Sequence, residues 1–234
     1  VWWRWRPVGW QVPLDATTAA WSAKKVMPGG GPCNLTNFGP RPGNILSEIP
    51  HFCQSALSRS GPSDFLALMA RHGIAWHEKT LGQLFCDGSA RQVVAMLLAE
   101  CAGAGVHVAC NAKVTGIATG EGFSVETEAA TYTGTALVLA TGGPSIPKMG
   151  ATGFAYEVAR KFGLGVITPR PALVPLKAKS EDVEFCSSLS GVSLKAVATF
   201  GATRFAENIL FTHRGLSGPA ILQISSYWRD GQDI

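Results

Sequence analysis

The feature that most constrains the fold of this chain is a continuous apolar run that ends in two glycines, TALVLATGG at residues 135–143. A strand covered by helices on both faces of a sheet is apolar at nearly every position, whereas a half-exposed strand alternates. The run therefore predicts a buried central strand of a parallel sheet. Its Thr-Gly-Gly end lets bare backbone approach a ligand at the carboxyl end of the strand, where open α/β sheets bind their ligands.

The segments around this run alternate between helical and strand patterns. Apolar residues at helical spacing, each series followed by glycine, predict helices over 62–73, 89–105 and 152–163. Ser63 is the expected N-cap of the first helix. Runs rich in β-branched residues predict short strands over 106–110, 113–119 and 123–128. The expected buried stripe of the helix over 89–105 consists of Val93, Val94, Leu97, Leu98 and Cys101.

This order of strand, helix, strand, glycine turn and helix is typical of an α/β doubly wound domain. The prolines of 169–176 interrupt the order, and strand patterns follow at 192–200 and 208–212. A helix start is expected at Pro219, after Ser217 and Gly218. We therefore predict a boundary near residue 172, with one domain over 1–172 and the start of a β-rich second domain over 173–234.

A second glycine-rich stretch, PGGGPCNLTN at residues 28–37, follows the short apolar strand pattern VPLD that ends at Asp15. Taken alone the stretch is most often a surface turn. In dinucleotide-binding folds, however, an acid at such a strand end accepts hydrogen bonds from a ribose, and glycine-rich backbone donates N–H groups to phosphate oxygens. Because two separate glycine loops are expected at the same end of the sheet, a cofactor site is favoured over two turns.

Composition limits the classes of partner. The 234 residues are 46% hydrophobic and 15% charged, with a formal net charge of +4. Lys and Arg are scattered with no run longer than Lys24-Lys25, so we expect no nucleic-acid or membrane partner. No membrane-spanning or secretion pattern is present, which predicts a cytoplasmic protein. The six cysteines show no C-x-x-C spacing, so neither a metal site nor a redox dithiol is expected.

The first ten residues, VWWRWRPVGW, hold four of the seven tryptophans. Because Trp is encoded only by TGG, the same bases read one position later give Gly codons. One hypothesis is that residues 1–11 are a frameshifted reading of the first β-turn-α of a nucleotide-binding domain. The nucleotide sequence tests this directly.

The stretches GGGPCNLTN, LVLATGGPSIPKMGATG, PALVPL and FTHRGLSGPAIL, in this order, resemble a family of bacterial NAD(P)/FAD-dependent oxidoreductases. This family includes aminoacetone-oxidase-like flavoproteins and reductases proposed to act on bile-acid intermediates. The resemblance runs from about Val12 to Trp228. It implies an incomplete, three-layer, glutathione-reductase-like FAD domain with a parallel sheet, interrupted by an inserted second domain. Three positions depart from the family pattern, since Pro32, Cys86 and Phe154 stand where Arg, Pro and Asp are usual.

The resemblance also implies the residues of an FAD site. Asp15 would accept hydrogen bonds from the adenosine ribose, and the backbone of Val114 would lie beside the adenine. The remaining implied cofactor-binding residues are Gly29, Gly30, Gly31, Asn34, Thr36, Asn37, Ala140, Thr141, Gly142 and Gly143. No acid or base for catalysis stands out in the sequence. For Cys33 and His213, packing or structural roles are favoured over catalytic ones.

The function that the resemblance implies is an FAD-dependent oxidoreductase that transfers hydride between flavin and a small organic substrate, with NAD(P)H as an open choice of electron donor. The alternatives are a nucleotide-binding module without redox turnover and a flavin-dependent tRNA-modifying relative. The opening glycine motif and the C-terminal return of the family are missing from residues 1–234. We therefore expect this fragment alone to retain little FAD and to have no turnover.

Overall fold

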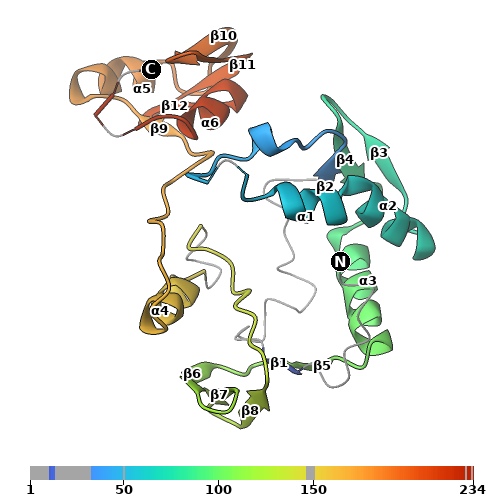
Figure 1. The fold of residues 1–234 in the computed structure, drawn as a ribbon. Helices are drawn as coiled ribbons and strands as arrows, with labels where there is room; N and C mark the ends of the chain where they lie inside the picture. Colours follow the sequence, from blue (N-terminus) through green and yellow to red (C-terminus); the bar gives the residue numbers. More distant parts are fainter. Residues whose placement is uncertain (1–10, 14–32, 50, 146–150, 230, 233) are drawn as a thin grey trace. The chain divides into compact units, whose positions relative to one another are not determined.

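The computed structural model describes residues 33–49, 51–145, 151–229, 231–232 and 234, together with the backbone of 11–13. The chain divides into two compact units, residues 1–164 and 165–234 (Figure 1). The predicted boundary near 172 lies eight residues into the second unit (172 − 164) and stays a prediction. No helix in the described ranges is long and apolar enough to cross a membrane.

The helices of the first unit lie where the apolar spacing predicts them. The predicted segments 62–73, 89–105 and 152–163 contain α2 (Pro62–Arg71), α3 (Ala90–Gly103) and α4 (Phe154–Lys161). Each is closed by a glycine with positive φ, at 66° for Gly73, 70° for Gly105 and 73° for Gly163. A left-handed residue at this position satisfies the last carbonyls of a helix, and glycine adopts it without strain.

The start of α2 differs from the prediction. Its N-cap is Gly61 and not Ser63, because Pro62 fits the first helical position, where no N–H is needed. The Asp64 carboxylate accepts a hydrogen bond from the Gly61 N–H at 2.8 Å and so satisfies the helix entry. Two elements that the sequence patterns did not predict precede α2, the 3-10 helix η1 (Pro42–Asn44) and the helix α1 (Gln54–Arg59).

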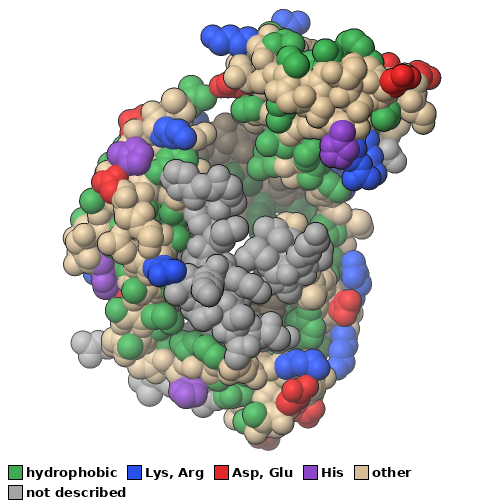
Figure 2. Space-filling view, turned by 180° about the vertical axis from the view of Figure 1, so that it is seen from behind, with side chains coloured by type: hydrophobic (Ala, Val, Ile, Leu, Met, Phe, Trp, Pro, Cys, Tyr) green, Lys and Arg blue, Asp and Glu red, His purple; other side chains and the backbone are tan. Residues whose placement is uncertain are grey.

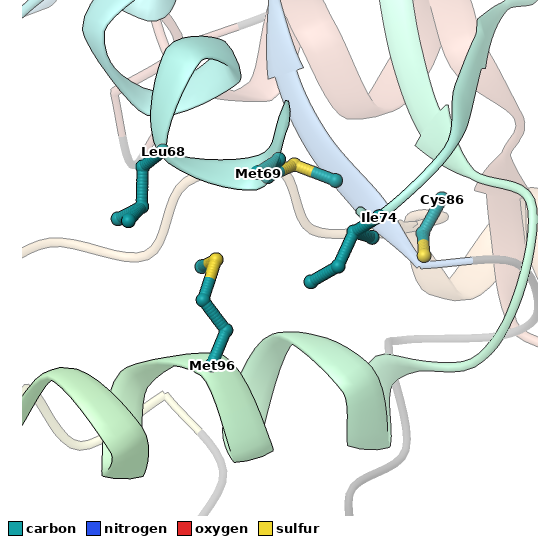
Figure 3. Packing of buried hydrophobic residues seen from close by; sticks show 5 residues of the cluster. All are labelled: Leu68, Met69, Ile74, Cys86 and Met96. Atoms are coloured by element: carbon teal, nitrogen blue, oxygen red, sulfur yellow. The ribbon is translucent and has the colours of Figure 1, made fainter. Parts of the chain in front are cut away.

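Helices α2 and α3 share a core with a small antiparallel sheet of order β2-β4-β3. The strands are β2 (Asn34–Asn37), β3 (Trp76–Glu78) and β4 (Gln83–Cys86). Figure 3 shows Leu68 of α2 and Met96 of α3 directed toward each other, while Met69 of α2 extends toward the side of Ile74 and Cys86. Met69 is fully buried and Met96 is 2% exposed.

The predicted stripe of α3 is only partly right. Met96 is buried and Val93 packs on the same core, whereas Leu97 and Leu98 are 46% and 39% exposed. The buried face therefore passes through positions 93 and 96, one turn apart, rather than through the larger leucines. Other large apolar side chains are also exposed, and Figure 2 shows them on the surface among polar ones.

A second core in the first unit joins a meander to α4. The strands β6 (Val114–Thr119), β7 (Phe123–Thr127) and β8 (Thr131–Gly134) pair antiparallel in chain order. Ile117 and Val125 pack with Val158 of α4. The strands predicted over 113–119 and 123–128 are confirmed, and β8 adds the third strand of the meander.

The apolar run over 135–143 does not form the predicted strand. Leu137 and Leu139 are half-buried against the α4 core, while Val138 between them is 57% exposed. The run is thus covered on one side only. Strand formation needs hydrogen-bonding neighbours, and no described segment pairs with residues 136–143.

The predicted parallel sheet is not shown among the described residues. Parallel pairing is limited there to β1 (Gln11–Pro13) with β5 (His107–Ala109), and the larger described sheets are antiparallel. The described part of the chain is mixed α/β, and the three-layer arrangement around a parallel sheet stays a prediction. The pairing of β1 with β5 does match the strands predicted at residues 12–15 and 106–110.

The second unit is a four-stranded antiparallel sheet of order β10-β11-β12-β9 with helices. Its strands are β9 (Leu176–Lys177), β10 (Ser193–Phe200), β11 (Thr203–Thr212) and β12 (Gly215–Ser217). Its helices are η3 (Ser180–Asp182), α5 (Val183–Ser188) and α6 (Pro219–Ser225). The strands predicted over 192–200 and 208–212 and the helix start at Pro219 are confirmed. Strand β11 begins at Thr203, before the predicted segment 208–212.

Helix α6 forms the core of the second unit with one face of this sheet. Ala220 and Ile224 are fully buried, and Ala198 of β10 is 6% exposed beside them. The helix approaches the sheet closely at Gly218, its N-cap, which has φ 91° and ψ 165°. A Cβ at this position would lie 2.7 Å from the backbone oxygen of Asn208, so only glycine fits.

Candidate cofactor site

Three of the predicted cofactor residues, Asn34, Thr36 and Asn37, lie on β2 at the end of the glycine-rich stretch. The ladder to β4 shifts register between Asn34 and Thr36, which marks an irregularity in the strand. Asn34 and Asn37 are exposed, while Thr36 is half-buried. Thr36 also lines a pocket of about 350 Å³ between β2 and the start of α2, together with Leu35, Pro40, Leu57, Ser60, Gly61, Pro62 and Phe65.

The amide of Asn37 has local hydrogen-bonding partners. Its Nδ2 donates to the carbonyl of Leu81 at 3.3 Å, and its Oδ1 accepts from the N–H of Gly39 at the same distance. Leu81 and Gly82 both have positive φ, at 55° and 75°, in the turn that leads into β4. Asn37 therefore fixes this turn, and its assignment to a cofactor stays a prediction.

Cys33 lies beside Cys86 at the start of β2. The Cys33 carbonyl accepts a hydrogen bond from the Cys86 N–H at 2.9 Å, which places Cys33, just before β2, next to Cys86 at the end of β4. Burial, and in second place the neighbouring Cys86, raise the pKa of the Cys33 thiol above its usual value. A neutral thiol is a poor nucleophile. Packing therefore accounts better for Cys33 than redox chemistry does.

The predicted residues of the second glycine loop, Ala140, Thr141, Gly142 and Gly143, follow the half-covered run. Ala140, Thr141 and Gly142 are exposed and Gly143 is half-buried. Gly142 has φ 74°, and no atom lies within 4 Å of the position that a Cβ would take there. This backbone is open to a ligand in a conformation that favours glycine.

Helix α4 lies against the same loop. A Cβ on Gly143 would lie 3.2 Å from the Tyr156 hydroxyl, so this glycine allows close approach of loop and helix. Lys161, at the end of α4, donates from Nζ to the Ile117 carbonyl of β6 at 3.0 Å. A small pocket of about 190 Å³ between β6 and α4 includes Glu157 and Lys161. The places of Tyr156 beside the loop and of Lys161 beside β6 could not be predicted, because the sequence shows that both lie on a helix but not what their neighbours are.

The described cofactor-binding residues predicted from the sequence lie beside two different cores of the first unit. Asn34, Thr36 and Asn37 belong to β2 and its α2–α3 core. Val114 is half-buried and packs on the α4 core, as does Leu139 immediately before the second loop. Asp15, Gly29, Gly30 and Gly31 lie outside the described residues.

Comparison with known proteins decides the family. Residues 8–212 match a family model described as the HI0933-like protein Rossmann domain. The chain belongs to this HI0933-like family. The family is an FAD-binding group of oxidoreductases, so the resemblance to FAD-dependent oxidoreductases is confirmed at this level.

Two relatives of this HI0933-like chain are ribosomal RNA dihydrouridine synthases. The Escherichia coli K12 protein is 50% identical over 213 residues, and the Haemophilus influenzae protein is 42% identical over 217 residues. Both alignments cover 90% of this chain, against 53% and 54% of the relatives. A 3-dehydro-bile acid delta(4,6)-reductase of Clostridium scindens is 27% identical over 89% of this chain and 52% of its own. The chain spans about half the length of the curated relatives it matches.

These relatives overturn one expectation from the sequence. Scattered basic residues predicted no nucleic-acid partner, and the family resemblance implied a small organic substrate. The two more similar relatives, however, act on ribosomal RNA. The prediction judged the clustering of Lys and Arg along the chain only. Cations distant in sequence can share one surface after folding.

The geometry of the second glycine loop is compatible with the binding of FAD. The pyrophosphate of a dinucleotide needs backbone that it can approach closely. The open backbone at Gly142, and the close approach of loop and helix at Gly143, are compatible with this need. The expectation of FAD is thus consistent with the loop geometry as well as with the family.

Proposed function

We propose that this chain contributes the flavin-binding part of an enzyme that reduces uridine to dihydrouridine in ribosomal RNA. The observation that carries the proposal is the 50% identity to the Escherichia coli ribosomal RNA dihydrouridine synthase over 90% of the chain. The bile-acid reductase is 27% identical over a similar length, which gives a small organic substrate weaker support.

The reaction adds two hydrogens across the C5–C6 double bond of the uracil ring. Reduced FAD supplies a hydride when it is bound, and the protein supplies binding, orientation and exclusion of water. A proton must reach the neighbouring carbon to complete the reduction. NAD(P)H is the electron donor that we propose for restoring the reduced flavin.

The proposed roles of this chain's own residues follow the two glycine loops. Asp15 accepts hydrogen bonds from the adenosine ribose, and Gly29, Gly30 and Gly31 donate backbone N–H groups to the pyrophosphate. Asn34 and Thr36 line the cofactor along β2, and Asn37 supports the turn beside this strand. Val114 offers backbone to the adenine. Residues Ala140 to Gly143 close on the cofactor from the second loop.

A purified protein tests the proposal. The open reading frame that contains this chain is expressed complete, reconstituted with FAD and mixed anaerobically with NADPH and deproteinised ribosomal RNA from a strain that lacks the gene. We expect a flavin absorbance spectrum, reduction of the flavin by NADPH, and reoxidation that depends on the RNA. An apoprotein that takes up no FAD, or a reduced flavin whose reoxidation is indifferent to RNA, would contradict the proposal.

A pair of matched variants shows whether the predicted ribose contact is used. Asp15→Asn keeps the size of the side chain but weakens its acceptance from hydroxyl groups. We expect weaker FAD retention for Asp15→Asn than for Asp182→Asn, an equivalent change in the second unit. If both variants hold FAD as the parent does, Asp15 has no role at the ribose. A nucleotide-binding module without turnover would bind FAD and show no RNA-dependent step.

A further inference from the structure

The sheet of the second unit has two unlike faces. Side chains alternate between the faces of a strand, and directly opposite residues on neighbouring strands share a face. Ala198 of β10 lies opposite Phe205 of β11, and both belong to the core that α6 covers. Leu176 of β9 and Leu216 of β12 are opposite each other on this covered face.

The register assigns the intervening residues to the opposite face. Lys195 lies opposite Asn208, Val197 opposite Ala206, and Thr199 opposite Arg204. On the far edge, Lys177 lies opposite Gly215 and shares this face. Lys177, Lys195, Arg204 and Asn208 are exposed, and Val197 is 59% exposed. We call this surface of β10, β11, β12 and β9 the open face.

The charges on the open face have a single sign. Lys177, Lys195 and Arg204 point to it, and no acidic residue of the four strands does. Glu207, the acidic residue of these strands, lies opposite Ala196 on the side of α6. The ion pairs in the described part of the chain involve none of the three cations. Lys195 and Arg204 are about 13 Å apart along the strand direction, given the rise per residue of a strand.

Phosphate groups are contacted mainly by Lys and Arg, with Thr and Asn as additional donors. The open face supplies this set, with Thr199 and Asn208 next to the cations. We propose that the open face binds the phosphate backbone of the ribosomal RNA substrate. This inference rests on the proposed function, which it deepens by assigning an RNA-contacting surface.

Charge complementarity favours the RNA phosphate backbone over a second copy of this chain as the partner of the open face. A second copy of the chain would place the same three cations against their equivalents. Lysine is also depleted in the cores of protein–protein interfaces. A polyanion instead gains by releasing its condensed counterions when cations contact its phosphates.

The test compares two double variants of the complete FAD-loaded protein. Lys195→Gln/Arg204→Gln removes two cations from the open face, while the control Arg41→Gln/Arg59→Gln removes two exposed cations of the first unit. The probe is a fluorescein-labelled RNA of mixed sequence and about 30 nucleotides, longer than the site sizes typical of single-strand-binding folds. Binding is followed by fluorescence anisotropy at several salt concentrations, with thermal unfolding to confirm that both variants are folded.

We expect the open-face variant to bind RNA about tenfold more weakly near physiological salt, and its log–log salt slope to fall by about 1.4 to 1.8, as for the loss of two phosphate contacts. The control should stay within about twofold of the parent, because its cations lie elsewhere. Equal weakening of both variants would overturn the proposal, since net charge would then explain the binding. Parent-like binding by the open-face variant would also overturn it, as would a change confined to oligomeric state on gel filtration.

This readout separates the open face from the proposed function. RNA binding that depends on Lys195 and Arg204, in a protein that forms no dihydrouridine, would refute the function and keep the surface. Dihydrouridine formation with an unchanged KM for ribosomal RNA in the open-face variant would refute the surface and keep the function.

Discussion

At the scale of single residues, Gly218 makes the clearest prediction. Its φ of 91° and ψ of 165° belong to a region used almost only by glycine. A Cβ would also lie 2.7 Å from the Asn208 oxygen and 2.8 Å from the Leu210 nitrogen, both backbone atoms of β11 that cannot easily move. We expect Gly218→Ala to lower the free energy of unfolding by at least about 2 kcal/mol. Urea unfolding followed by circular dichroism measures this change.

Gly201, in the turn between β10 and β11, is the matched control. Its φ is 57°, and no atom lies within 4 Å of where a Cβ would be. Gly201→Ala should therefore cost only the strain of the left-handed conformation, about 1 kcal/mol. Equal losses for the two variants would show that the contacts with β11 do not matter.

Cys33 makes a pH-dependent prediction. Burial, with a smaller contribution from Cys86, raises the pKa of its thiol above the usual value of 9.0. Below that pH the thiol is neutral in both the folded and unfolded states, so it leaves stability unchanged. As the pH rises above it the unfolded chain ionises more readily, and the stability of the folded protein falls.

Alkylation kinetics measure the same property. Iodoacetamide reacts with thiolates, so at pH 8 we expect the exposed Cys110 to be modified before Cys33. Peptide mass mapping over time distinguishes the two sites. Equal rates would mean that Cys33 has an ordinary, accessible thiol.

At the scale of elements, the segment over 136–142 is where the fold and the proposed cofactor site meet. It pairs with no described strand, whereas β6 and β7 pair along their length. Backbone amides without such bonds exchange quickly with solvent. We expect rapid hydrogen exchange over 136–142 in the protein without FAD, slow exchange in β6 and β7, and added protection of 136–142 when FAD binds. Unchanged exchange on FAD binding would place the cofactor elsewhere.

The sequence predicts local elements better than it predicts their partners. Helices α2, α3 and α4 were predictable because their apolar spacing and closing glycines are local signals. The run over 135–143 was wrongly predicted as a strand because pairing depends on distant segments. The short strands β3 and β4, of 3 and 4 residues, carry too little periodicity to be recognised.

In the candidate cofactor site, too, the order of residues along the chain could be predicted but their contacts could not. The position of Asn34 and Thr36 after a glycine-rich loop could be predicted from their order in the chain. The bond from Asn37 to Leu81 could not, because it joins residues 44 positions apart. The close approach of Tyr156 to Gly143 likewise depends on how α4 packs against the loop.

At the scale of the whole molecule, the two compact units have separate cores. Met69 in the first unit and Ile224 in the second are both fully buried. Replacing either by alanine should cost about 2–5 kcal/mol in the unit that contains it. Calorimetry of Met69→Ala and Ile224→Ala should show different transitions lowered, and Leu98→Ala, at an exposed position, should lower neither appreciably. Identical effects of the two core variants on every transition would show a single cooperative structure.

At this scale the central proposal is that the protein containing this chain makes dihydrouridine in ribosomal RNA. The direct measurement is mass spectrometry of nuclease-digested ribosomal RNA from the parent strain, a deletion strain, and deletion strains carrying the intact gene or its Asp15→Asn variant. We predict that a dihydrouridine, heavier than uridine by two hydrogens, is lost on deletion, restored by the intact gene and restored less by the variant. Ribosomal RNA with the same dihydrouridine content in the parent and deletion strains would contradict the account.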